Sequence, residues 1–146
     1  MRLTKRYYLE CAHQLSGLRP NHKCMRLHGH NYMVDLTVVP KTKAEKAGED
    51  WEVMKDGMVI DVGELDIVVA PIFKKIDHTF LNESLNDGTP AGKVAAAQPT
   101  AENIATYLWE RLKLMRNDPR YCLVNVRVYE NNDMWVDVGF DSGDAR

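Results

Sequence analysis

The stretch from His28 to Val39 constrains the possible folds of this chain more than any other. Its alternate positions hold one set of residues: His28, His30, Tyr32, Val34, Leu36 and Val38. Side chains of a β-strand alternate between two faces, so this period of two predicts a strand with one largely apolar face. The same face begins with two histidines, and both imidazoles therefore project to the same side of the strand.

Three further segments have the composition of strands. In Leu3–His13, apolar residues and the terminal histidine fall on one face at a period of two. Leu123–Glu130 and Met134–Phe140 are rich in β-branched and aromatic residues, and Asn131-Asn132-Asp133 between them is typical of a hairpin turn. We therefore expect four strands, of which the last two form a hairpin.

Two helices are expected between the strand pairs. Glu64–Ile76 carries apolar residues at helical spacing, and Pro71 inside it is expected to kink or split that helix. Thr100 is a suitable N-cap for a second helix that continues to Met115. Phe80–Gln98, which lies between them, is rich in turn residues and is expected to be mostly loop.

The order β-β-α-α-β-β predicts a single α+β domain over residues 1–146, with helices grouped on one face of an antiparallel sheet. The polar segment around residues 40–58 is expected to be an exposed hairpin excursion, with Met58–Asp61 returning beside the sheet. A four-stranded sheet has two open edges, and edge-to-edge association of several copies would cover them.

The bulk properties exclude several classes of protein. A net charge of −2 over 146 residues does not favour binding to nucleic acid or to an anionic membrane. The longest apolar stretch, Ile67–Phe73, is far shorter than the ~20 residues of a membrane span. The N-terminus lacks the apolar core of a signal peptide, and three cysteines form no disulfide framework, so we expect a cytoplasmic protein.

The richest group of reactive side chains is the run H-K-C-M-R-L-H-G-H at residues 22–30. Two imidazoles two positions apart on a strand can bind one zinc ion, and His13 is the natural third ligand if its strand pairs with that of His28 and His30. The alternatives are an exposed histidine pair, or histidines that only form hydrogen bonds within the sheet.

Cys24 lies four residues before His28 and has three possible roles. It could be an inert small side chain, a fourth ligand that closes a structural zinc site, or a thiolate base or nucleophile. Asp77 and His78 form an adjacent pair that is usually surface or capping chemistry. Glu130 ends a strand, where a carboxylate can accept two N–H bonds from a guanidine-like edge.

Five motifs occur in order along the chain: C-A-H ending at residue 13, C-x₃-H-G-H at 24–30, D-H-x-x-L-N at 77–82, P-T-A-E-N at 99–103 and Y-E at 129–130. Their order and spacing resemble one known family, the 6-pyruvoyl-tetrahydropterin and 6-carboxy-tetrahydropterin synthases. The match spans almost the whole chain. It implies the T-fold, whose subunits join edge to edge into trimeric barrels that stack as a hexamer.

The resemblance also implies roles for individual residues. His13, His28 and His30 match the zinc ligands, and Cys24 matches the catalytic cysteine. Asp77 and His78 match a pair that completes the proton-transfer machinery. Glu130 matches the glutamate that anchors the pterin ring, and Thr100 and Glu102 match a segment near that ring. The implied substrate is 7,8-dihydroneopterin triphosphate, and the implied active sites lie between subunits. Zinc is the implied cofactor, and no redox cofactor is required.

The three-residue gap between Cys24 and His28 resembles the bacterial 6-carboxy-tetrahydropterin synthases of queuosine biosynthesis, which release acetaldehyde and triphosphate. The long segment at residues 40–58 departs from their compact pattern and leaves the 6-pyruvoyl product as the alternative. A non-catalytic zinc module and a different T-fold enzyme, such as a GTP cyclohydrolase, are more remote alternatives.

Overall fold

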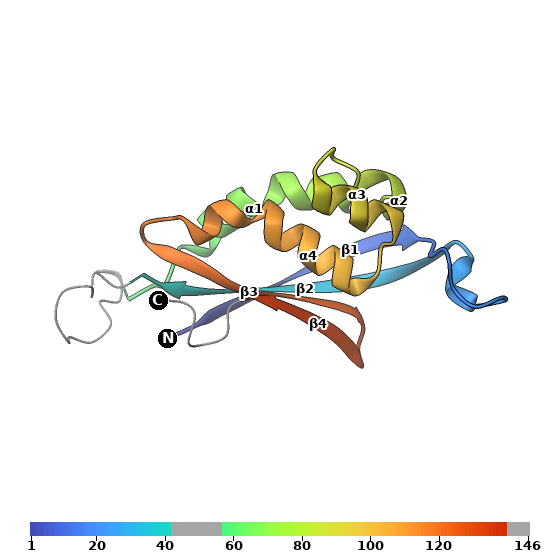
Figure 1. Ribbon diagram of the computed structural model, residues 1–146. Coiled ribbons are helices and arrows are strands. Elements are labelled where there is room, and N and C mark those ends of the chain that lie inside the picture. Colours follow the sequence, from blue (N-terminus) through green and yellow to red (C-terminus); the bar gives the residue numbers. More distant parts are fainter. Residues whose placement is uncertain (42–56, 140–146) are drawn as a thin grey trace.

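The computed structural model describes residues 1–41 and 57–139 of the chain. Its centre is an antiparallel sheet in the order β1-β2-β3-β4, so all four expected strands are confirmed (Figure 1). The strands are β1 (Leu3–His13), β2 (His28–Pro40), β3 (Tyr121–Asn131) and β4 (Met134–Gly139). The expected excursion at residues 40–58 falls mainly on 42–56, which lie outside the described residues.

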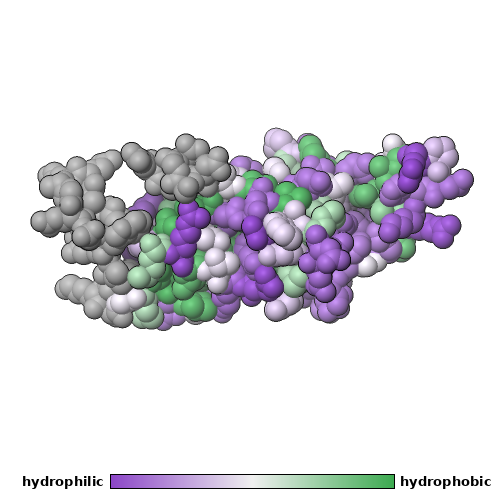
Figure 2. Space-filling model, turned by 90° about the horizontal axis from the view of Figure 1, so that it is seen from below, coloured by the Kyte–Doolittle hydropathy of each residue, from purple (hydrophilic) through white to green (hydrophobic). Residues whose placement is uncertain are grey.

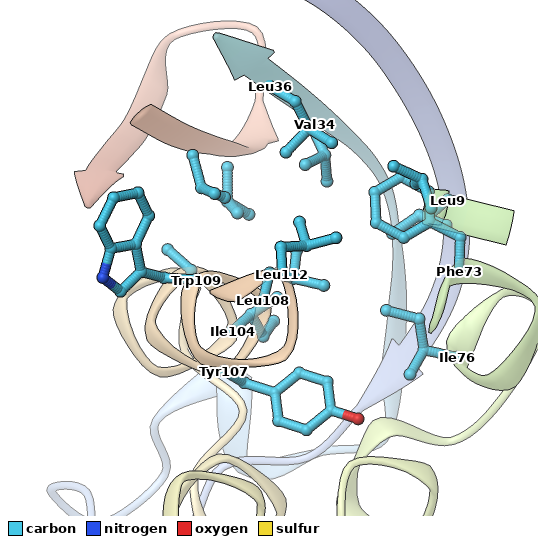
Figure 3. Packing of buried hydrophobic residues seen from close by; sticks show 14 of the residues in the cluster. Leu9, Val34, Leu36, Phe73, Ile76, Ile104, Tyr107, Leu108, Trp109 and Leu112 are labelled. Carbon is cyan, nitrogen blue, oxygen red and sulfur yellow. The ribbon is translucent and has the colours of Figure 1, made fainter. Parts of the chain in front are cut away.

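Helices cover one face of the sheet (Figure 1). They are α1 (Val62–Ile76), α2 (Leu81–Ser84), α3 (Pro90–Ala97) and α4 (Ala101–Arg111), with short 3-10 helices η1 (Lys23–Met25) and η2 (Lys113–Arg116). The core lies between α1, α4 and the sheet: Figure 3 shows Leu9, Val34 and Leu36 of the strands opposite side chains of both helices. This arrangement confirms the expected α+β class.

Four details differ from the sequence-based expectations. Pro71 does not split α1, which is continuous from Val62 to Ile76. The second long helix ends at Arg111 rather than Met115, and a 3-10 helix follows it. Residues 80–98 contain two short helices, because Thr89 caps α3 with its hydroxyl and Pro90 occupies the first turn. Met58–Asp61 is not a strand, although Val59 and Ile60 are buried.

Strand register determines which polar side chains meet. The pairing of β1 with β2 sets His13 directly opposite His28. Because β3 is antiparallel to β2, the end of β3 lies beside the start of β2, and Met33 pairs with Tyr129 one position before Glu130. His13, His28, His30 and Glu130 therefore come together at one end of the sheet, on its helix-covered face.

The opposite face of the sheet carries charged and aromatic side chains that pair with one another. Arg6 binds both carboxylate oxygens of Asp35 at 2.7 and 2.8 Å, and Arg127 binds both oxygens of Asp137 at 2.8 Å. Figure 2 shows this face, where hydrophilic residues cover much of the middle. Bidentate pairs of this kind neutralise the cations within the sheet.

Candidate functional site

Three imidazoles form a compact cluster where β1 ends and β2 begins. The ligand nitrogens of His13, His28 and His30 all lie within 4.8 Å of one another, and the Nε2 atoms of His13 and His28 are 3.0 Å apart. A tetrahedral zinc site with Zn–N bonds of ~2.0–2.1 Å has nitrogens separated by about 3.3 Å. The cluster therefore fits one metal ion with only small shifts, and His13 is the third member, as the pairing of β1 with β2 led us to expect.

The hydrogen bonds of two of these histidines fix which nitrogen faces the cluster. Nδ1 of His13 lies 2.6 Å from the carbonyl oxygen of Pro99, and Nδ1 of His28 lies 2.7 Å from that of Arg26. A carbonyl only accepts, so each Nδ1 carries the proton and each Nε2 presents a lone pair. Two lone pairs 3.0 Å apart repel each other unless a cation lies between them. Such carbonyl partners are typical of metal-binding histidines.

The surroundings of His30 also indicate that the cluster can accept a cation. Its Nε2 is buried and has no hydrogen-bond partner, while Oε1 of Glu130 lies 3.5 Å away. The same carboxylate oxygen is 3.7 Å from Nε2 of His13. Burial lowers the pKa of His13 and of His30, so both remain neutral lone-pair donors at neutral pH. The donor set suits a divalent cation such as zinc.

Gly29, between the two β2 histidines, is needed for close strand packing. A Cβ at this position would lie 3.3 Å from the carbonyl oxygen of Cys11 on β1. A side chain there would require this carbonyl to move by a few tenths of an ångström.

Cys24 lies in η1, within the loop that joins the two ligand-bearing strands. Its side chain is half-buried, and its carbonyl oxygen accepts a 2.9 Å hydrogen bond from the Leu15 N–H. Burial, and after it the charge of Glu130, raise the pKa of Tyr32, a residue that contacts His13.

Asp77 and His78 lie elsewhere, at the edge of β1 just after α1. Nδ1 of His78 is 2.9 Å from Oδ2 of Asp77, and the His78 side chain is 74% exposed. Burial acts to raise the pKa of Asp77, but hydrogen bonds from the Glu10 N–H and from His78 lower it overall. A cavity of about 350 Å³ beside the pair is lined by Glu10, Asn31, Thr79 and neighbouring strand residues.

Thr100 and Glu102 begin α4. The Thr100 hydroxyl accepts a 3.4 Å hydrogen bond from the Asn103 N–H, and Glu102 is exposed. The role of Pro99, the preceding residue, could not be inferred from its side chain, because its backbone carbonyl is the group that orients His13. Tyr32, whose hydroxyl is 3.2 Å from Nδ1 of His13, could have been noticed from its position on the histidine face of β2.

The sheet, the helices on one face and the histidine cluster define a T-fold protein with a candidate metal centre. The family model for 6-pyruvoyl tetrahydropterin synthase matches residues 2–139. The chain therefore belongs to the 6-pyruvoyl tetrahydropterin synthase family. No helix in the part of the chain that the structure describes is long and apolar enough to cross a membrane.

Relatives carry two kinds of name. A putative 6-carboxy-5,6,7,8-tetrahydropterin synthase of Archaeoglobus fulgidus is 31% identical over 127 residues, which cover 87% of this chain and 85% of the relative. A 6-pyruvoyl tetrahydrobiopterin synthase of Drosophila melanogaster is 27% identical over 139 residues, covering 88% and 73% respectively. The solved 6-pyruvoyl tetrahydropterin synthase of Caenorhabditis elegans has the same fold, with a TM-score of 0.70, 22% identity and coverage of 97% and 96%.

Proposed function

We propose that this protein is a zinc-dependent lyase that converts 7,8-dihydroneopterin triphosphate and one water molecule into 6-carboxy-5,6,7,8-tetrahydropterin, acetaldehyde and triphosphate. The observation that carries the proposal is the convergence of three imidazoles and one carboxyl group at the end of the sheet. His13, His28 and His30 would hold the zinc ion, and zinc bound there would supply a Lewis acid for the hydroxylated side chain of the substrate.

The protein residues divide the remaining work. Glu130 accepts N–H bonds from the 2-amino group and N3 of the pterin, which fixes the ring relative to the histidines. Cys24 as a thiolate removes a proton from the substrate side chain, and the Asp77–His78 pair relays protons. Thr100 and Glu102 lie beside the ring at the start of α4. These roles follow the family motifs at the same positions of this chain.

The exposure of the Asp77–His78 pair supports an oligomeric enzyme, and so does the place of β1 and β4 as the outer strands of the sheet, although residues 78–80 already pair with Glu10 and Ala12 at one end of β1. We propose a hexamer made of two trimeric barrels, with active sites between subunits, acting in the cytoplasm. Light scattering should give the mass of a trimer or hexamer at micromolar concentration. A monomer mass would contradict the assembly.

The reaction is tested by product analysis. Purified protein is incubated with 7,8-dihydroneopterin triphosphate and an aldehyde trap, and mass spectrometry identifies the pterin. We expect 6-carboxy-tetrahydropterin together with trapped acetaldehyde. A 6-pyruvoyl product without acetaldehyde would assign the chain to the 6-pyruvoyl branch of the family, the branch that matches the name of the Drosophila relative. Formate release from GTP would instead indicate a cyclohydrolase, and zinc bound through sulfur without turnover would indicate a non-catalytic module.

A further inference from the structure

Two side-chain amides bind the backbone of the segment that follows β1. The amide of Asn82, in α2, accepts a 2.9 Å hydrogen bond from the Gln14 N–H and donates one of 2.9 Å to the Gln14 carbonyl. The amide of Gln98, at the C-cap of α3, accepts from the Ser16 N–H at 2.8 Å and donates to the Ser16 carbonyl at 2.5 Å. Each amide thus satisfies both backbone groups of one residue, as a neighbouring strand does in a sheet.

The other side of the same segment contacts the loop that carries Cys24. Leu15 lies between the two amide-bound residues and donates its N–H to the Cys24 carbonyl at 2.9 Å. The Gln14 side chain donates to the Met25 carbonyl at 2.8 Å. This alternation is that of an extended chain, whose successive residues direct their backbone groups to opposite sides. Residues 14–16 therefore connect the two amides to the Cys24 loop.

The amides lie close to the histidine cluster in sequence, but they do not hold its ligands. Gln14 directly follows His13, and Gln98 directly precedes Pro99. His13 itself is fixed by the pairing of β1 with β2 and by the Pro99 carbonyl oxygen, 2.6 Å from its Nδ1. The bonds of the two amides therefore act on the Cys24 loop rather than on the metal ligand.

The Cys24 loop has little apolar packing to hold it in place. Its short helix η1 has no buried residue. A segment with few buried contacts is held mainly by its hydrogen bonds, and it opens locally when these are lost. The order of this loop is therefore expected to depend on the bonds that it receives through residues 14–16.

We infer that Asn82 and Gln98 are positioning residues, whose side-chain amides set the place of the Cys24 thiol relative to the histidine cluster. The inference rests on the proposed function, because the role of Cys24 as a base is what makes its place matter. A reacting group displaced by ~1 Å can lose about a hundredfold in rate. Asn82 is also the last residue of the D-H-x-x-L-N motif at 77–82, and its bonds to the backbone give that residue a function in this chain.

The test replaces each amide by a carboxylate of the same shape. Asn82→Asp and Gln98→Glu keep an oxygen that accepts from the backbone N–H, but they set a second oxygen against the backbone carbonyl, which cannot donate to it. Asn86→Asp is the matched control, because this exposed residue changes charge equally and its Oδ1 still accepts the 3.4 Å bond from the Gly88 N–H. Asn82→Ala and Gln98→Ala, which remove the bonds without adding charge, replace any carboxylate variant that does not fold.

Hydrogen exchange of the zinc-loaded protein, followed by mass spectrometry, is the first readout. Peptides that cover residues 14–27 should exchange about tenfold faster in either amide variant, since one hydrogen bond is lost and one carbonyl is left unpaired. The same peptides of Asn86→Asp should stay within about twofold of the wild type, as expected for a surface change away from the loop. Zinc content should remain near one ion per chain in all three variants, because the three ligands are retained.

Kinetics provide the second readout. The kcat of each amide variant should fall by about 10–100-fold, while KM for 7,8-dihydroneopterin triphosphate stays within about threefold, because the groups that bind the substrate are unchanged. The same substitutions are then made in Cys24→Ala. There they should change the remaining kcat by less than about twofold, since no thiol is left to position. A role in general stability alone would lower kcat by the same factor with and without the thiol.

Failure of the two proposals can be told apart. If the amide substitutions speed exchange of the loop but the wild type forms no pterin product, the proposed reaction is wrong and the control of the loop by the amides stands. If product forms and both variants keep the wild-type kcat, or lose the same factor in the Cys24→Ala background, the inference is overturned. Loss of zinc from the variants would also overturn it, because the amides would then act on the metal ligands.

Discussion

The histidine cluster and the Asp77–His78 corner use the same kinds of side chain in opposite surroundings. His13 is fully buried, with its Nδ1 2.6 Å from the Pro99 carbonyl oxygen and its Nε2 3.0 Å from Nε2 of His28, inside the cluster. The His78 side chain is 74% exposed, and its Nδ1 lies 2.9 Å from the carboxylate of the neighbouring Asp77 at the edge of β1. One chain completes the first arrangement by itself. The Asp77–His78 pair exposes its acid–base groups to solvent, and screening by solvent weakens their electrostatic interaction. The pair is therefore suited to a site that the surface of another subunit completes.

The largest expected effect is loss of metal from the buried cluster. His28→Ala should reduce the metal content from about one zinc ion per chain to nearly none, because a three-ligand site cannot spare a ligand. His22→Ala is the matched control, since His22 caps η1 outside the cluster and should leave the zinc in place. Elemental analysis of protein purified without added metal decides. Equal zinc in wild type and in a His13/His28/His30 triple alanine variant would refute the site.

The next largest effect is expected on turnover rather than on metal content. Cys24→Ala and His78→Ala should each lower turnover by ~10²–10⁴-fold, the usual contribution of a proton-transfer group. Both should keep their zinc, because neither residue belongs to the cluster. Loss of zinc from Cys24→Ala would instead make Cys24 a ligand of a closed structural site.

Mixing these two inactive variants tests whether the corner serves a neighbouring chain. If Cys24 and His78 act in one site from different subunits, exchange should form some sites with both wild-type residues and restore part of the activity. Exchange is verified by mass spectrometry of tagged subunits. No recovery in demonstrably mixed oligomers would place both residues of a site in the same chain.

A smaller effect is expected at Glu130, which faces the cluster without being one of its three ligands. Glu130→Gln keeps the shape of the side chain but removes its charge, and should raise KM by about 10–100-fold, the value of one or two charged hydrogen bonds. Zinc content should stay near that of the wild type. A large fall in zinc affinity would mean that the carboxylate belongs to the metal site rather than to the ring-binding site.

The smallest effect concerns Cys11, which shares its face of β1 with His13 but lies in the core. Burial raises the pKa of the Cys11 thiol to about 12, and its Sγ donates to the Ile76 carbonyl at 3.2 Å. Iodoacetamide at pH 8 should therefore label half-buried Cys24 and leave Cys11 unmodified. Peptide mapping after brief labelling provides the measurement, and rapid modification of Cys11 in folded protein would contradict its burial.

The sequence predicted the strands and the histidine cluster because both depend on short-range periodicity. Alternation in β1 and β2 fixes which side chains share a face, and antiparallel pairing then brings His13 to His28. Two short helices in residues 80–98 were missed because the turn residues that suggested a loop also cap α3. The backbone carbonyls of Pro99 and Arg26 could not have been found, since a carbonyl has the same chemistry at every position.

At Pro71, tertiary packing outweighed the local rule that a proline interrupts a helix. A proline removes one helical hydrogen bond, yet Val69 and Phe73 on either side of it are buried, and this packing keeps α1 continuous. The positions of Asp77 and His78 relative to the cluster likewise depended on where α1 ends against β1. That is a tertiary property with no counterpart in the local pattern.

The backbone of His78 has a consequence for how this chain can be altered. Its φ of 57° lies in the left-handed region, where a residue with a Cβ is strained by about 1–3 kcal/mol. Hydrogen bonds hold it there, including the 2.7 Å bond from the His78 N–H to the Glu10 carbonyl. Glycine or asparagine would occupy this conformation more comfortably, so replacing His78 with either should give a protein that unfolds at higher temperature. A selection for heat resistance alone would then tend to discard this histidine, and one that also requires turnover would retain it.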